Sequence, residues 1–116
     1  MVTAQDLAKT LRARAAARRA KAEVRAERLL TLLPQAAKLL AERYRASRVV
    51  LFGSLAEGTF SEQSDVDLAV EGMLSACYFD ALAELMALFG VPVDLVRFEE
   101  AVPSLRAHLE AEGRTL

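Results

Sequence analysis

Two aspartates alternate with apolar residues in the middle of the chain. Asp65 and Asp67 are separated by Val66 and followed by Leu68, a pattern that indicates a strand over 65–70. Alternate residues of a strand share one face, so the two carboxylates should lie side by side. Such a pair repels itself unless a cation intervenes, and its hard oxygens suit Mg²⁺. An ordinary solvent-facing pair on a half-buried strand is the alternative.

A third aspartate, Asp94, lies within Val91–Arg97, whose other residues before Arg97 are apolar. A carboxylate is unfavourable there unless it has a partner or lines a site. If this strand lies beside 65–70, three carboxylates could converge on one face. Two could then hold metal, and the third could accept a proton from an attacking hydroxyl.

A Gly-Ser pair follows the apolar run Arg48–Phe52. Gly53 leaves no side chain between backbone N–H groups and a ligand, and several such groups can hold an anion. Ser54 adds a hydroxyl donor. The pair alone is equally typical of a turn after a strand. Together with the aspartates, it points to handling of a nucleoside triphosphate.

The spacing of these residues resembles a known family. Gly53-Ser54, ten intervening residues and then Asp65-x-Asp67 are similar to the motif of the polymerase-beta-like nucleotidyltransferase superfamily. The chain resembles its minimal branch, the MNT proteins, which many genomes pair with HEPN-domain toxins. The resemblance covers roughly residues 31–116. It extends to three local patterns: Leu-Phe-Gly-Ser-x-Ala-x-Gly, Ser-Asp-x-Asp-Leu and Val-Asp-Leu-Val.

The resemblance implies an α/β (α+β) fold, with a small mixed sheet that has helices on one face and the acidic site on the other. It implies two Mg²⁺ ions held by Asp65 and Asp67, with Asp94 as third ligand and activator of the acceptor. Gly53 and Ser54 would bind the β and γ phosphates of ATP, the expected substrate. An acceptor hydroxyl would attack the α-phosphorus, and pyrophosphate would leave.

The resemblance also implies a partner. The chain is too short to contain a domain that holds a substrate, so the acceptor of AMP is expected to be another protein. In MNT–HEPN pairs the transferase acts as antitoxin by adenylylating a Tyr of the HEPN toxin. The alternative is an antitoxin that neutralises its partner by contact alone. The sequence does not identify the base, the acceptor atom or the number of nucleotides added.

One residue departs from the family pattern. Many relatives carry a basic residue where this chain has Glu57, between the Ala and Gly of the Gly-Ser loop. An anion there cannot help to hold triphosphate. The positive charge would then have to come from Arg48 or from the basic N-terminal segment.

Helix and strand patterns divide the chain into a basic helical arm, residues 1–30, and a nucleotidyltransferase domain, residues 31–116. Pro34 is expected to start a second helix or to kink the first. The helix after Ser75 should bury Phe79 and Met86 among others. The expected elements are a helix over 3–31, a helix as far as Tyr44, strands Arg48–Phe52 and 65–70, a helix from Ser75 to about Phe89 closed by Gly90, an edge strand Val91–Arg97, and a helix from Pro103 to Gly113.

Charge is distributed unevenly. Residues 1–48 carry twelve basic and four acidic side chains, whereas residues 49–116 carry three basic and twelve acidic ones. The arm has only a thin apolar stripe, so it needs a surface: its own acidic body, a partner, or another copy in an oligomer. Nucleic acid is an unlikely partner because no aromatic residue lies among the basic ones.

Composition narrows the class of protein. Hydrophobic residues make up 53% of the chain, which favours a folded domain. No apolar run approaches the roughly 18 residues of a membrane span, so no membrane association and a cytoplasmic location are expected. The lone Cys77 excludes an internal disulfide. His108 is expected at the surface, and Tyr44 and Tyr78 at the edge of the core rather than stacked on a base.

Overall fold

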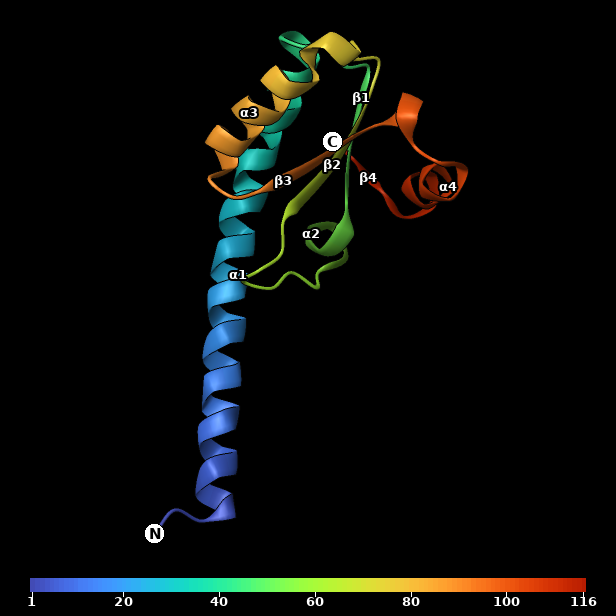
Figure 1. Cartoon of the computed structure of the whole chain (residues 1–116). Helices are drawn as coiled ribbons and strands as arrows, with labels where there is room; N and C mark the ends of the chain where they lie inside the picture. The colour runs from blue at the N-terminus through green and yellow to red at the C-terminus, as the bar shows by residue number, and fades with distance from the viewer.

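A computed structural model describes residues 1–116, which form a layered body and one long helix that extends beyond it (Figure 1). The longest dimension is 63 Å. No helix combines the length and apolar character needed to cross a bilayer. The elements in chain order are α1 (Ala4–Glu42), β1 (Arg48–Phe52), α2 (Gly53–Glu57), β2 (Val66–Glu71), the 3₁₀ turn η1 (Ser75–Cys77), α3 (Tyr78–Phe89), β3 (Val93–Arg97), the 3₁₀ turn η2 (Phe98–Glu100), α4 (Pro103–Glu112) and β4 (Arg114–Thr115).

The four strands form one mixed sheet in the order β3-β2-β1-β4. β1 is antiparallel to β2 and to β4, whereas β2 and β3 are parallel and are connected through α3. The third strand therefore lies at an edge, as Pro92 predicted, although it begins at Val93 rather than Val91. The two-residue strand β4 was not predicted, because a segment that short has no periodicity of its own.

The sheet has one fully covered face and one partly covered face. On the first, α1 and α3 pack over the alternating residues Val66, Leu68 and Val70, all with no exposed surface. This confirms the alternation predicted for the second strand. On the other face, α4 and η2 cover one end with a smaller core of four buried residues: Val50, Ala69, Phe98 and Leu109. The other end of this face remains open.

α1 is a single helix that continues through Pro34, instead of ending there. Pro34 is exposed, and the buried residues Leu33 and Ala36 on either side of it pack against the body. This packing outweighs the loss of one backbone hydrogen bond. The helix begins with a capping box, in which Thr3 and Asp6 bond each other's backbone N–H groups at 3.1 Å.

α3 buries part of the predicted face but not all of it. Leu85 and Phe89 are completely buried as expected, whereas Phe79 is 78% exposed and Met86 is 43% exposed. Tyr78 takes the core side instead, where its hydroxyl donates a 2.7 Å hydrogen bond to the carbonyl of Leu95 on edge strand β3. That contact satisfies a strand carbonyl with no neighbouring strand and leaves Phe79 pointing outward.

Polar contacts join α1 to α3 at two levels. Arg28 donates to the carbonyl of Phe89, at the end of α3, over 3.0 Å. Near the end of α1, the hydroxyl of Tyr44 donates to Glu84 over 2.5 Å and Arg43 pairs with the same carboxylate at 2.6 Å. The bond to Glu84 raises the pKa of Tyr44 to about 12. These contacts fix the direction of α1 relative to the sheet.

The buried residues of α1 begin at Ala22. Residues 1–21 therefore extend beyond the core, and we call them the overhang (Figure 1). Within the overhang only Ala8 and Ala15 are half-buried, and every other residue is exposed.

Substitution of one leucine on each part of α1 tests this division. Leu29→Ala should lower the free energy of unfolding by about 2–5 kcal/mol, because Leu29 is fully buried and a cavity would remain. Leu11→Ala, at a residue that is 53% exposed, should change it by no more than about 0.5 kcal/mol. Urea titration of both variants measures the difference. Equal destabilisation by the two would contradict an exposed overhang.

Candidate active site

The Gly-Ser pair and the aspartates meet where β1 ends. Gly53 has φ 72°, a left-handed conformation, and begins the short helix α2 in a region predicted to be loop. A Cβ built on Gly53 would overlap a carboxylate oxygen of Asp67 and lie 2.9 Å from its Cγ. Glycine is therefore needed here for its backbone angle and because the Asp67 side chain lies directly against its backbone.

The strand register places the aspartates. Phe52, Asp67 and Asp94 form one row across β1, β2 and β3, since Phe52 pairs with Asp67 and Asp67 with Asp94. Neighbouring strands lie roughly 4.8 Å apart, so the last two carboxylates are neighbours on the open end of the sheet face. Asp65 lies just before β2 and is exposed. The third strand does lie beside the second, which was the condition for the carboxylates to converge.

Negative charge accumulates in this row. Burial, followed by the carboxylates of Asp94 and Asp65, raises the pKa of Asp67 to about 6. The carboxylates of this row repel one another, and a bound cation would relieve that repulsion. Their oxygen atoms are the kind of ligand that suits Mg²⁺. The side chains are not drawn together into a preformed cage of three or more acidic, His or Cys groups. Asp67 and Asp94 are brought together, and Asp65 lies in the loop immediately before β2.

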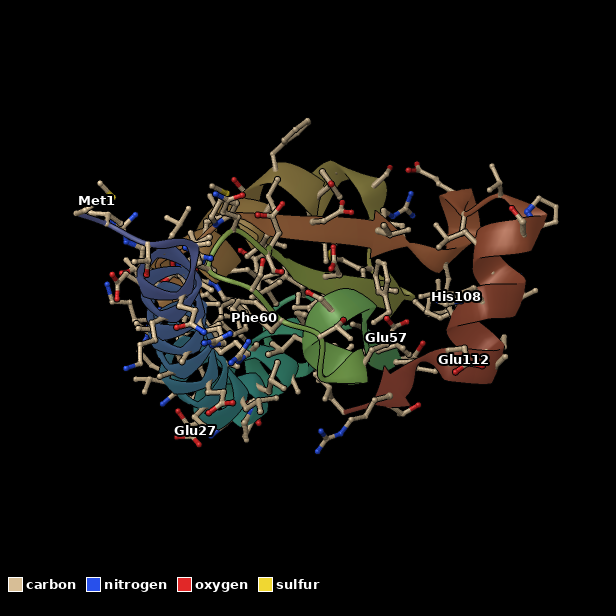
Figure 2. All side chains as sticks on the ribbon, turned by 90° about the horizontal axis from the view of Figure 1, so that it is seen from below. Met1, Glu27, Glu57, Phe60, His108 and Glu112 are labelled. Atoms are coloured by element: carbon tan, nitrogen blue, oxygen red, sulfur yellow. The ribbon has the colours of Figure 1, made fainter.

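Arg48 does not supply positive charge to this site. It lies at the opposite end of β1, where its guanidinium pairs with Glu110 at 2.7 Å and Glu71 at 3.5 Å. The same group stacks over the ring of Phe98, 4.2 Å from its centroid. Glu57, which replaces the basic residue of many relatives, is exposed on α2 (Figure 2). Of the two candidate sources of charge, only the basic helix remains.

α1 runs beside the loop that joins α2 to β2. Phe60 of this loop lies between α1 and α2, with the guanidinium of Arg25 6.0 Å from its ring centroid (Figure 2). Helix and loop enclose a groove of about 550 Å³. Its lining residues are Ala15, Arg18, Arg19, Ala22 and Glu23 from α1, and Gly58, Phe60, Ser61, Glu62 and Gln63 from the loop. The basic helix thus reaches the segment that leads into Asp65.

Two serines hold this loop. The backbone N–H of Ser61 donates to the hydroxyl of Ser64 over 3.0 Å, and the two hydroxyls lie 3.0 Å apart. These contacts shape a turn in the loop. Sequence reasoning missed α2 and the position of Phe60. An aromatic residue in an otherwise polar loop was the signal for the second of these.

The other residues considered from the sequence lie at the edge of the core or at the surface, outside the acidic row. Tyr44 and Tyr78 are hydrogen-bonded at the edge of the core, as predicted, and burial raises the pKa of Tyr78. His108 is exposed on α4. Cys77 is a free, half-buried thiol packed against the core.

Comparison with known proteins identifies the fold. The family model described as "Polymerase beta, Nucleotidyltransferase" matches residues 35–116. This chain belongs to that family. The match begins within α1, so it includes every strand and every residue of the candidate site.

The nucleotidyltransferase is similar to several known proteins. A Methanocaldococcus jannaschii protein that bears the provisional name of a protein adenylyltransferase is 32% identical over 81 residues, or 64% of this chain and 81% of that protein. A solved structure, provisionally described as a minimal nucleotidyltransferase, has TM-score 0.65 and 34% identity, covering 76% of this chain and 95% of that one. A solved structure of a toxin–antitoxin complex containing MntA has a chain with TM-score 0.61 and 25% identity; the match covers 72% of this chain and 69% of that one.

The raised pKa of Asp67 makes a prediction for the metal-free protein. The folded state disfavours the ionised carboxyl, so stability is lost as pH rises from 3.8, the ordinary pKa, through about 6. Asp67→Asn removes this penalty and should stabilise the protein at pH 8 by about 1–2 kcal/mol, after allowance for solvent screening, but not at pH 4. Thermal melting in EDTA at both pH values measures this. The exposed-site variant Glu112→Gln should show no such pH-dependent gain; a gain for Asp67→Asn at pH 4 would contradict the repulsion.

The close contact at Gly53 makes a second prediction. Gly53→Ala has to accommodate both a left-handed backbone and the overlap with Asp67, and should destabilise the protein by about 2–4 kcal/mol. Gly58→Ala is a matched control, since Gly58 also has positive φ (78°) but a Cβ there would meet nothing within 4 Å. That variant should lose only about 1 kcal/mol. Chemical denaturation compares the two, and equal losses would show that Asp67 does not restrict Gly53.

Proposed function

We propose that this nucleotidyltransferase transfers AMP from ATP to a hydroxyl of a partner protein. The observation that carries the proposal is the row formed by Asp67 and Asp94 with the backbone of Gly53 against it. A nucleotide's phosphates and its metal need such a combination: carboxylate oxygens beside bare backbone N–H groups. The provisional name of the M. jannaschii relative supports adenylyl as the group transferred.

Each residue of the site has a proposed role. Asp65 and Asp67 would hold Mg²⁺, with Asp94 as a third ligand. The bound metal would neutralise charge on the phosphate oxygens as pyrophosphate leaves. Gly53 and Ser54 would bind the β and γ phosphates through backbone N–H groups and the serine hydroxyl. Asp94 is exposed on an edge strand, where an acceptor hydroxyl can approach and give up its proton.

The proposed acceptor is a tyrosine of a HEPN-domain toxin. The site lies at the open end of one sheet face, away from the residues that α4 and η2 cover. A side chain of another protein can approach the aspartates there. The similarity to an MntA-containing toxin–antitoxin complex supports this assignment.

Transfer can be measured directly. The acceptor to use is the product of the adjacent reading frame, expected to be a small all-helical protein with an Arg-x₄-His motif. With ATP and Mg²⁺, the wild type should add adenylyl groups that mass spectrometry locates on a tyrosine. Asp94→Asn should slow transfer by at least about 100-fold, because it removes the proton acceptor. Unchanged transfer by Asp94→Asn would overturn that role, and no mass increase with wild-type protein would overturn the function.

The exposed basic overhang favours a second function, neutralisation of a toxin by contact alone. The double variant Asp65→Asn, Asp67→Asn distinguishes the two. If transfer is the mechanism, cells that express the toxin should no longer be protected by this variant, although it still binds the toxin. Full protection would establish contact as sufficient.

A further inference from the structure

The overhang presents an apolar stripe that continues the buried face of α1. Residues spaced three, four or seven apart share one side of a helix. Leu7, Leu11 and Ala15 therefore lie in line with Ala22 and Leu29, which pack on the body. Leu7 is 54% exposed and Leu11 53% exposed. The stripe thus runs on past the body with nothing covering it.

The sides of the stripe are basic. Residues 1–21 contain six Lys or Arg and a single acidic residue, Asp6. Helical spacing puts Arg12 and Arg19 on one border of the stripe, Arg14 and Lys21 on the other, and Arg18 within the stripe itself. Lys9 falls on the opposite, outward side of the helix. The inner face is therefore a narrow line of Leu and Ala that includes Arg18 and has basic side chains along both borders.

This inner face is turned toward the side of the body where the site lies. Ala15, Arg18 and Ala22 line the groove formed with the loop that leads into Asp65. The overhang extends past the end of the sheet that carries α2 and that loop (Figure 1). Contacts between α1 and α3 at both levels hold it in this direction. A protein seated on the stripe would therefore lie beside the entrance to the site.

We propose that the overhang is the docking element for the acceptor, and that its occupant is an acidic amphipathic helix of that protein. This inference rests on the proposed function. An apolar stripe with small residues lets a second helix approach closely, and acidic residues on its borders would match the arginines. By holding the acceptor beside Asp94, the overhang would supply binding energy and orientation away from the reacting atoms.

Two other occupants fit less well. A second overhang would bring two strongly basic helices together, and like charges in contact are unfavourable. Nucleic acid would match the arginines but would leave Leu7 and Leu11 uncovered, and the overhang offers no aromatic ring for base stacking. An acidic helix with an apolar face satisfies both features of the surface.

The test compares loss of positive charge on the two sides of the overhang. The inner variant is Arg12→Gln with Arg18→Gln. The outer control, which lowers the net charge by the same two units, is Lys9→Gln with Ala13→Glu; both of these residues are exposed and lie four apart on the outward side. Calorimetry measures how tightly each variant binds the purified product of the adjacent reading frame. Each pair of substitutions is made in the Asp65→Asn, Asp67→Asn protein, which we call the parent, so that transfer does not interfere with the measurement. The inner pair should weaken binding at least tenfold and the outer pair less than about threefold. Leu11→Glu should also weaken it, and all variants should melt like their parent.

The outcomes separate this inference from the proposed function. In otherwise wild-type protein, the inner pair should raise KM for the acceptor by a larger factor than KM for ATP. Selective loss of binding without any detectable transfer would uphold docking and overturn the function. Normal transfer with unaltered acceptor KM in the inner pair would overturn docking and uphold the function. Docking would also be overturned if the parent protein did not bind the acceptor protein, or if both pairs weakened that binding equally. Two further results would overturn it: a parent protein that self-associates and becomes monomeric with Leu11→Glu, and binding of RNA that only the inner pair abolishes.

Discussion

The contact between the backbone of Gly53 and the carboxylate of Asp67 is the constraint around which the site is built. It needs β1 and β2 to pair antiparallel in a register that puts Phe52 opposite Asp67. A shift of one residue would turn Asp67 into the core and Leu68 outward. Burial of Val66, Leu68 and Val70 under α1 and α3 excludes that shift. The core of the protein therefore holds the acidic row in place, although no core residue touches a ligand.

The second face of the sheet shows how a small protein keeps part of its surface open. α4 and η2 cover Val50 and Ala69 at one end, and Arg48 closes that end with its ion pairs. At the other end Asp67 and Asp94 have no helix above them. Their repulsion is tolerated because the row is only partly buried, and the raised pKa of Asp67 reflects it. A surface left in that state suits a cation and an anionic substrate better than it suits packing.

α1 combines two roles along one helix. Its C-terminal half covers the sheet with a stripe of buried residues, while its N-terminal part continues the same stripe into solvent. Capping by Thr3 and Asp6 stabilises an end that receives no help from the core. The positive charge of the overhang lies beyond the end of the sheet that carries α2, which is also the end where the acidic row lies (Figure 1). Such an arrangement suits a partner that presents acidic residues to the overhang and is not strongly acidic where it faces the row.

Local patterns of the sequence determined most of the elements and indicated the residues of the candidate site. Alternation in 65–70 predicted the strand and its buried face, Gly90 ended a helix as expected, and Gly53, Asp65, Asp67 and Asp94 were proposed as site residues from their spacing and resemblance to a family. These features depend on residues near one another in the chain, where steric and periodic rules act directly.

Only the tertiary structure decided features that depend on contacts between distant segments. The sequence allowed Arg48 to supply positive charge to the site, but the fold places it at the far end of β1, where it pairs with Glu110. Pro34 was expected to start a second helix or to kink the first, and α1 runs through it as one helix with buried residues on both sides. Periodicity placed Phe79 on the buried face of its helix. In the structure Tyr78 lies on the core side, where its hydroxyl donates to a carbonyl of β3, and Phe79 is exposed. In each case a contact across the chain outweighed a local preference of smaller free energy.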